Sequence, residues 1–597
     1  MKKKIVLLAA IILFVISVVV CIALDDAKDT GVHVADDKKI EQIKAKSELS
    51  DMAFLLCYED EELPYDAASH TFYLPLDMEE SEWEEGKLSG YFVENSTIDK
   101  TETTNGSASI DGNNDSGNGD SNNGNDNSNN GDSYVVSNSE KNSSNDNSKI
   151  IKSKLLFAQD YTTTDKQSAI ANGQPFPFLA LGKDGYGEYK LVFTGLPMIT
   201  FHGTEYTADD GSQMFAFTVY DTDHDGDWVT TCYTKSRLRG NTSLTFEKKS
   251  LRLYLKEIKD DGTFEKCNKN LLGLRDDDDW ILNALYADNT RIRDQLCVDL
   301  WNEVGAKDQL YGYNYGTASA MVEVFINDGY QGIYDLMVPI DAKQLGLRPV
   351  SEQLTQNTDV VERIYKKKYS REWLSSDFVG ELPDPNSPDY RGGFYLKGDT
   401  ILQNEQEWKP LYRIAEALGS DEKTFASEIT QYNEQQNLID NWLFYQAIAG
   451  FDNENKNYYY VVRNRGGKEY GYFIPWDMNI SFGMVYADNV YFSEELASIV
   501  TEPVTWQPAQ RMIELDVDNS KELLQTTWNK WRKGVFSDEA ITERIQELEH
   551  KVKDSGAFKR EDARYPNGNQ KEDFSYIYDF AVKRLAYVDG YVEELCR

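Results

Sequence analysis

Three polar residues in the second half of the chain have the types and the order needed for phosphoryl transfer. Asp452 and Asn457 begin and end a polar loop, and Asp477 follows further along the chain. Between them, residues 458–463 and 469–475 predict two strands joined by a turn that contains Gly-Gly. A hairpin brings the residue before its first strand close to the residue after its second. We therefore expect all three side chains at one end of this hairpin.

This order of residues matches the needs of the chemistry. Phosphoryl transfer uses a carboxylate to orient the acceptor hydroxyl, and oxygen ligands for the metal ion on the phosphates. Protein kinases place an Asp-x4-Asn loop, a hairpin and a metal-binding Asp in the same order. We predict Asp452 and Asn457 as catalytic residues, and Asp477 and Asn457 as metal ligands. The His-Arg and the Asp-Phe-Gly of those kinases are missing here, so a polar loop that merely caps a hairpin stays an alternative.

A second group of residues is a concentration of cations in an otherwise acidic chain. It consists of Arg239, Lys248, Lys249 and Arg252, which surround an Arg-Gly-Asn turn and the strand that follows it. Backbone N–H groups of a tight turn can cradle phosphate oxygens, and cations offset their charge. We predict these four residues as the nucleotide-binding set. A β-hairpin with a solvated basic face is the alternative.

The overall charge limits the classes of partner. The 597 residues include 62 Lys and Arg against 101 Asp and Glu, which gives a net charge of −39. A nucleic-acid partner needs a basic surface, so we predict none. The chain has only five histidines, so we do not expect a metal centre built from several histidines.

The first 24 residues predict that the protein is located outside the cytoplasm or in the cell membrane. Three lysines at 2–4 precede an apolar run at 5–24, which is long enough to span a bilayer with the lysines inside. Residues 1–24 are therefore a membrane anchor or a signal segment. An uncleaved anchor, cleavage after Ala23 and lipid attachment at Cys21 are the three alternatives. Each predicts either a single-pass membrane protein with its bulk outside the cytoplasm or a secreted protein.

The rest of the chain divides by composition. Residues 25–50 are charged and are interpreted as a stalk, and 51–236 as a β-rich region. An Asn/Asp/Gly/Ser insert at 95–148 interrupts that region and predicts disorder. Residues 237–597 form a second region that becomes helical, so the fold class is α+β. Apolar spacing predicts helices that begin near Ile292, Leu438, Ile541 and Phe574.

Taken together, these segments resemble the spore coat protein H (CotH) kinase family over about residues 237–483. The matching segments are 239–243, 248–250, 280–293, 322–334, 452–457 and 475–477. The resemblance implies a bacterial, exported or membrane-anchored protein with a bilobal atypical protein-kinase-like fold, β-rich in its N-terminal part and helical in its C-terminal part. It implies ATP with Mg²⁺ or Mn²⁺ as cofactors, and Ser or Thr of a protein substrate as acceptor. Asp452 is then the catalytic aspartate and Asp477 the metal ligand.

One departure from the family keeps other functions open. The family usually shows Trp-Asp-x-Asp, and Asn479 replaces the second Asp here. A non-catalytic coat-like protein or surface adhesin with the same fold is the second hypothesis. Carbohydrate binding by the β-rich segment before Arg237 is the third.

Two further features of the sequence, residues 221–227 and Lys397, each allow two interpretations. The run 221–227 imitates the start of a calcium loop, but Cys232 stands where that loop needs Glu, which favours an acidic turn between strands. Lys397, at a predicted strand end, is either a phosphate contact or a surface lysine.

Overall fold

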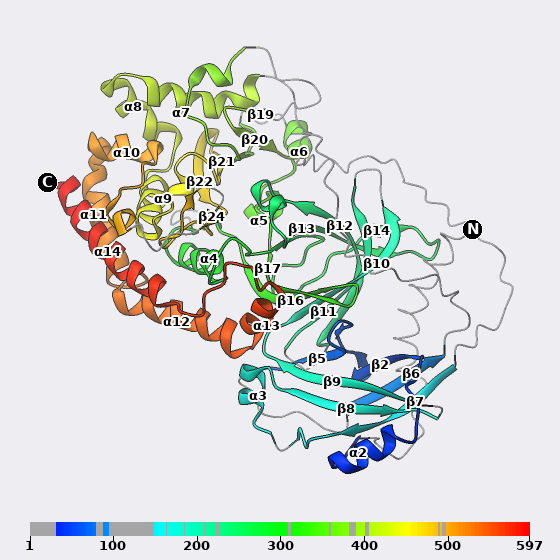
Figure 1. The fold of residues 1–597 in the computed structure, drawn as a ribbon. Helices are drawn as coiled ribbons and strands as arrows, with labels where there is room; N and C mark the ends of the chain where they lie inside the picture. The colour runs from blue at the N-terminus through cyan, green and yellow to red at the C-terminus, as the bar shows by residue number, and fades with distance from the viewer. Residues whose placement is uncertain are drawn as a thin grey trace.

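The computed structural model describes most of the chain outside its N-terminus and several internal segments (Figure 1). The described residues are 32–78, 87–94, 149–162, 164–183, 185–207, 211–222, 227–307, 312–356, 360–380, 390–399, 405–487, 490–491 and 497–597. The predicted anchor or signal segment at 1–24 and the predicted disordered insert at 95–148 lie outside them. Among the described residues, no helix combines the length and the apolar character that a membrane span requires.

The first part of the fold is a nine-stranded sheet that two short helices accompany. Its order is β3-β2-β6-β7-β8-β9-β5-β4, and β1 pairs in parallel with β7. Its core is aromatic, and Phe54, Phe72 and Phe178 are among its buried rings. The elements are β1 (Val32–Val34), α2 (Asp37–Lys44), β2 (Ala53–Tyr58), β3 (Glu61–Glu62), β4 (Tyr65–Asp66), β5 (Thr71–Pro75), β6 (Leu88–Glu94), β7 (Lys149–Phe157), α3 (Lys166–Asn172), β8 (Pro175–Leu181) and β9 (Tyr186–Thr194).

This sheet includes residues that the sequence had assigned to a stalk. In β1, Val34 pairs with Phe157 of β7, and the Asp36 side chain caps α2 by accepting the Lys39 N–H at 2.8 Å. Ile40 of α2 is buried in a small apolar cluster with Leu156. The described residues from 32 to 50 therefore belong to the folded part and not to a stalk. A helix cap and strand pairing order this charged segment around few apolar residues.

The second part is a closed barrel with one appended strand. Its order is β12-β11-β10-β16-β17-β15-β13-β14, and a further pairing of β12 with β13 closes the ring. Closure removes free strand edges and encloses a core that contains Trp280 and Leu253. The elements are β10 (Met198–Thr207), β11 (Gln213–Tyr220), β12 (Val229–Arg239), β13 (Ser250–Ile258), β14 (Phe264–Lys266), β15 (Asp279–Asn283), α4 (Arg293–Val304), β16 (Ser319–Ile326) and β17 (Gly329–Met337).

The predicted boundary between residues 236 and 237 falls inside β12. Strands β10 and β11 precede that boundary, yet they belong to the same barrel as β13 to β17. The proposed unit 51–236 is therefore not a separate structural layer. Alternation of apolar residues predicts strands, but it does not say which sheet each strand joins.

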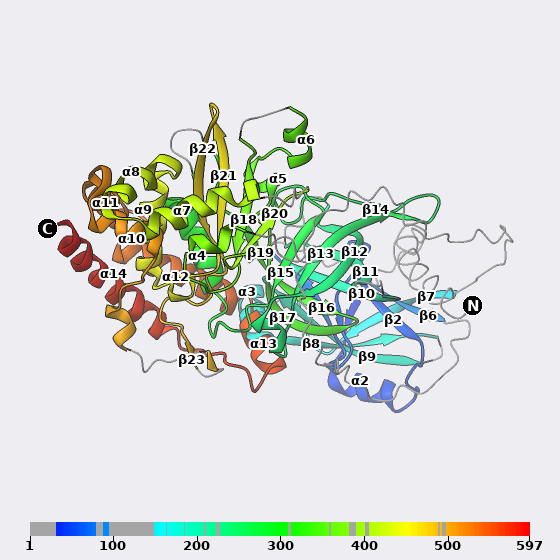
Figure 2. The same ribbon diagram turned by 90° about the horizontal axis from the view of Figure 1, so that it is seen from above.

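The third part is a five-stranded sheet with helices around it (Figure 2). Its order is β19-β20-β18-β21-β22. The strands are β18 (Arg363–Lys367), β19 (Tyr390–Arg391), β20 (Phe394–Lys397), β21 (Tyr458–Arg465) and β22 (Lys468–Pro475). The helices between β17 and β21 are α5 (Ala342–Leu345), α6 (Val350–Thr355), α7 (Lys409–Gly419), α8 (Glu422–Tyr432) and α9 (Gln435–Ile448).

The C-terminal part is helical and wraps along one side of the molecule (Figure 1). It follows the small pair β23 (Tyr486–Ala487) and β24 (Val490–Tyr491). Its helices are α10 (Gln507–Glu514), α11 (Ser520–Arg532), α12 (Asp538–Asp554), α13 (Ala557–Arg564) and α14 (Ser575–Cys596). The predicted helices that begin near Ile292, Leu438, Ile541 and Phe574 are confirmed as α4, α9, α12 and α14. The protein is thus a mixed α+β protein with a β-rich N-terminal half and a helical C-terminal part.

A buried ionic network fastens this C-terminal part to the barrel. Glu561 of α13 accepts from Lys248 Nζ at 2.8 Å and from Arg291 Nε at 2.6 Å, and all three side chains are fully buried. The Ile333 N–H of β17 donates to the same carboxylate at 2.5 Å. Burial alone would raise the pKa of Glu561, but the two cations hold it below its ordinary value.

We predict that Glu561→Gln lowers the free energy of unfolding by about 3–5 kcal/mol, because it leaves two buried cations without their counter-charge. Denaturant unfolding of the purified chain measures this. The matched control is Glu593→Gln, which removes an exposed partner of Arg597 and should cost less than about 0.5 kcal/mol. Equal effects of the two substitutions would contradict the role given to the network.

Candidate active site

The predicted hairpin is present and its turn explains its register. Strands β21 and β22 pair from Tyr458 opposite Pro475 to Arg465 opposite Lys468. Gly466 and Gly467 form the connection with φ values of 59° and 86°. Positive φ at both positions is what a two-residue hairpin turn needs, and glycine adopts it without steric cost. The prediction for this segment is confirmed.

One buried asparagine holds the open end of the hairpin together. Asn453, which is fully buried, donates through Nδ2 to Asn457 O at 2.8 Å and to Trp476 O at 3.0 Å. The Trp476 N–H donates in turn to Asn457 O at 3.0 Å, and the Asn457 N–H donates to Lys367 O at 2.9 Å. The polar loop is therefore fixed to both strands of the hairpin and to β18. Asn453 is not among the site residues predicted from the sequence.

The three predicted residues meet at this end. Asp452 Oδ2 accepts from Asn457 Nδ2 at 2.6 Å, and its Oδ1 pairs with Lys456 Nζ at 2.9 Å. Burial raises the pKa of Asp452; Lys456 opposes this effect, and the nearby Asp477 adds to it. Asn457 and Asp477 have φ values of 60° and 56°. Non-glycine residues in this left-handed region are uncommon, and such conformations cluster at functional sites.

A third acidic residue joins Asp452 and Asp477 from the barrel side. Asp294 lies in the first turn of α4 and is 2% exposed. Its Oδ1 accepts the Met478 N–H at 3.1 Å, and its Oδ2 accepts Asn283 Nδ2 at 2.5 Å. Burial, and then the neighbouring Asp477, raise the pKa of Asp294 to about 7. Asp294 is not among the predicted site residues; its signal in the sequence is an acidic side chain directly after residues 291–293.

The start of α4 is tied to the chain that follows Asp477. Arg293 pairs with Asp288 at 2.5 Å and donates from Nε to Ser481 O at 3.0 Å. Asp288 also accepts the Arg293 backbone N–H at 2.7 Å. All three residues are buried. These bonds fix Asp294, the next residue of α4, against the segment that carries Asp477.

A basic pocket lies between the barrel and the five-stranded sheet, beside these carboxylates. The cations that line it are Arg237, Arg239, Arg252, Lys366, Lys368 and Lys397. Arg239 lowers the pKa of Asp294, so the pocket and the carboxylates are within electrostatic reach of each other. Lys366 lies over the rings of Tyr459 and Trp476, at 5.6 Å from each centroid. Because Trp476 precedes Asp477, this contact links the two halves of the site.

Two members of the pocket show why it suits a polyanion. Arg252 pairs with Asp279, but its Nε has no hydrogen-bond partner among the described residues. Lys397 donates to Ile340 O at 2.9 Å, and burial, followed by repulsion from Arg252, lowers its pKa to about 8. An anionic ligand would accept a hydrogen bond from Arg252 Nε. Its negative charge would also favour the charged form of Lys397. Of the two alternatives weighed for Lys397, the structure places it in the pocket.

The structure does not bring Lys248 and Lys249 to this pocket, which differs from the prediction. Lys248 is fully buried against Glu561 in the network described above. Lys249 turns back on its own loop, where it donates to Leu244 O at 2.6 Å and to Phe246 O. The four predicted cations therefore have two roles: some line the pocket, and the others form hydrogen bonds or ion pairs inside the protein. Of the predicted nucleotide-binding set, Arg239 and Arg252 line the pocket.

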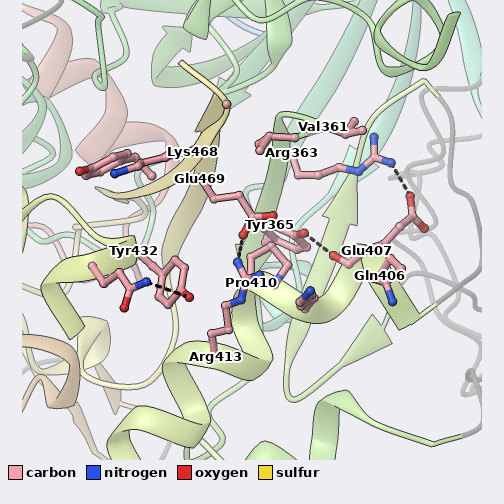
Figure 3. Close-up of a pocket in the computed structure, with 15 residues that line it drawn as sticks. Val361, Arg363, Tyr365, Gln406, Glu407, Pro410, Arg413, Tyr432, Lys468 and Glu469 are labelled. Atoms are coloured by element: carbon pink, nitrogen blue, oxygen red, sulfur yellow. Dashed lines mark hydrogen bonds and ion pairs between the residues drawn. The ribbon is translucent and has the colours of Figure 1, made fainter. Parts of the chain in front are cut away.

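A larger cavity lies on the opposite side of the same sheet (Figure 3). Its volume is about 590 Å³, against about 40 Å³ for the basic pocket. Two of its arginines already pair with carboxylates: Arg363 pairs with Glu407 at 2.7 Å, and Arg413 pairs with Glu469. The larger of the two cavities is therefore not the better candidate for the active site. The smaller pocket has the acidic loop end beside it.

The calcium-like run is described only in part, because residues 223–226 lie outside the described ranges. The Asp221 N–H donates to Trp228 O at 2.8 Å, next to the paired ends of β11 and β12. Within the described ranges, no three His, Cys, Asp or Glu side chains gather as a metal site. The described contacts favour a turn between strands.

Clustered carboxylates beside a pocket lined by cations are the arrangement that a nucleotide-using phosphotransferase requires. The chain matches the family model described as CotH kinase protein over residues 236–588, which is more than half of its length. It belongs to this family, and the resemblance seen in the sequence is confirmed. A comparison with curated proteins finds no match.

We predict that Lys397→Met weakens the binding of tripolyphosphate about tenfold at pH 7 and little at pH 9.5. The Lys397 pKa of about 8 means that the ammonium form is lost as the pH rises through this value. A charge-assisted hydrogen bond is worth roughly 1.5–3 kcal/mol, and 1.4 kcal/mol is tenfold. Calorimetric titration at both pH values measures the ratio of the parent's affinity to the variant's. Lys423→Met, in the exposed first turn of α8, is the control; an equal ratio at both pH values would contradict the prediction.

Proposed function

We propose that the protein is an atypical protein kinase of bilobal, kinase-like fold that transfers phosphate from ATP to Ser or Thr of a protein, with Mg²⁺ or Mn²⁺. One observation carries this proposal. The hairpin end with Asp452, Asn457 and Asp477 lies beside the basic pocket, within the region that matches the family. Acidic and basic halves of a phosphoryl-transfer site thus come from distant parts of the chain.

The residues present fit a hard divalent cation. Asn457 turns its Nδ2 to Asp452, so its amide oxygen is left to coordinate a metal ion. Asp477 is exposed and offers a carboxylate. Oxygen ligands of this kind suit Mg²⁺ and Mn²⁺. Such an ion, held by Asn457 and Asp477, would offset the negative charge of the phosphates.

The protein's own groups have separate tasks in this mechanism. Asp452 accepts the hydrogen bond of the acceptor hydroxyl and takes its proton as the oxygen attacks. Lys456 and Asn457 hold that carboxylate in place from both of its oxygens. Arg239 and Arg252 bind the phosphates from the barrel side, and Lys397 binds them from the sheet.

Two other hypotheses from the sequence have no described feature that favours them. A scaffold or adhesin with this fold needs neither the carboxylates nor the basic pocket, and the β-rich segment before Arg237 is shared between two sheets. Export and membrane attachment through residues 1–24 stay predictions. Protease treatment of intact cells tests them, since an exported domain is cleaved without lysis.

We predict that Asp452→Asn and Asp477→Asn each reduce phosphate transfer by about 10²–10⁴-fold, because acid–base positioning and metal binding are lost. The assay uses γ-labelled ATP, Mg²⁺ or Mn²⁺, and a generic Ser/Thr acceptor protein together with the chain itself. The control is Asp440→Asn. Asp440 is buried in α9 and accepts from Gln436 at 2.8 Å, away from the site.

The control should label at the parent rate. Labelling by both variants at the parent rate would overturn the assignment of the site. No labelling by the parent under either ion, with no thermal shift on adding ATP and metal, would favour the scaffold.

A further inference from the structure

Around the buried carboxyl group of Asp294, burial and repulsion from Asp477 outweigh the attraction of Arg239. In the described part of the chain Asp294 forms no ion pair, and its two hydrogen bonds come from uncharged groups, the Met478 N–H and Asn283. A carboxylate taken out of water without a cation is costly. Its position beside Asp477 adds repulsion between like charges. A group in this position needs either a proton or a cation.

A second buried carboxyl group, that of Asp335, lies near Asp294. Asp335 of β17 is fully buried, and neither of its carboxylate oxygens has a hydrogen-bond partner among the described residues. It lies opposite Asn283 in the pairing of β15 with β17. Asn283 in turn donates to Asp294. Burial raises the pKa of Asp335 well above its usual range, so a row of buried acidic side chains, and not a row of fixed negative charges, leads to the site.

We propose that Asp294 is a ligand of the divalent ion together with Asp477, and that it supplies the carboxylate missing at Asn479. This inference rests on the proposed function, since it names a further ligand of the same metal site. It assigns one ligand to the barrel side and one to the hairpin end. The ion would then join the two halves of the site as well as the phosphates.

The geometry of the Asp294 carboxylate permits this role. Each oxygen accepts one hydrogen bond, and a carboxylate offers about four lone-pair positions. The Met478 N–H fixes one oxygen within one residue of Asp477. Asn283 holds the other oxygen from β15. Outer contacts of this kind orient metal ligands before the ion arrives.

A purely structural role is the competing explanation. Asp294 lies in the first turn of α4, and the preceding Ile292 offers no side-chain cap. An acidic residue there stabilises the helix N-terminus by about 0.3–1 kcal/mol. The two roles make opposite predictions for Asp294→Asn. A structural residue costs stability on removal, whereas an uncompensated ligand costs metal affinity.

The experiment measures Mn²⁺ affinity of the purified full-length chain by electron paramagnetic resonance, together with the melting temperature without metal. We expect Asp294→Asn to weaken Mn²⁺ binding at least about tenfold, which is the lower limit for loss of an outer-shell partner. Its melting temperature without metal should be equal to or higher than the parent's, because repulsion from Asp477 is removed. Asn479→Asp added to this variant should restore affinity.

The matched control is Asp299→Asn, one turn further along α4, where Oδ1 accepts from Gln295 at 2.8 Å. It should bind Mn²⁺ as the parent does. If Asp294→Asn does not fold, Asp294→Glu is used in its place. This variant keeps the charge at the helix start and displaces the carboxylate by one methylene, so the same loss of affinity is expected.

The outcomes separate this inference from the proposed function. If the Asp294 variant that folds binds Mn²⁺ like the parent while Asp477→Asn does not, Asp294 is not a ligand and the proposed site stands. If Asp477→Asn also binds like the parent, or the parent binds no Mn²⁺, the metal site and the proposed function both fail. Loss of affinity in both variants, with the Asp299 control unchanged, supports the inference.

Discussion

The site depends on one buried amide. The Asn453 side chain bonds to the carbonyls of Asn457 and Trp476, and so fixes the two chain segments that carry the acidic residues. The φ values of 60° and 56° at Asn457 and Asp477 belong to the turns that this bonding requires. Without the Asn453 bonds, Trp476 O would lose this donor, and Asn457 O would keep only the Trp476 N–H, at the place where the loop meets the hairpin.

Opposite charges from distant elements are then assembled around this fixed end. The barrel contributes Arg239 and Arg252, helix α4 contributes Asp294, and the five-stranded sheet contributes Lys366 and Lys397. In the proposed function, neither part alone holds all the groups that would bind a metal nucleotide. The proposed site therefore depends on the contact between the two parts, which the buried pairing of Arg293 with Asp288 and its bond to Ser481 stabilise.

The cations near β13 show how one sequence motif serves both stability and chemistry. Arg252 lines the pocket, while Lys248 neutralises Glu561, which is far along the chain in α13. A lysine with no exposed surface contributes to anchoring the C-terminal helices, because a buried ion pair is costly to break. Arg291 shares the same carboxylate, so the C-terminal part and the start of α4 are stabilised together.

The sequence by itself determined the local features: the β21–β22 hairpin, the helices α4, α9, α12 and α14, and the order Asp452, Asn457, Asp477. Each of these depends on residues close in sequence, whose spacing and turn chemistry are readable. Only the tertiary structure decided that β10 to β12 close a barrel with later strands, that Lys248 faces Glu561, and that Asp294 stands beside Asp477. These depend on pairings between distant segments, which charge and periodicity do not specify.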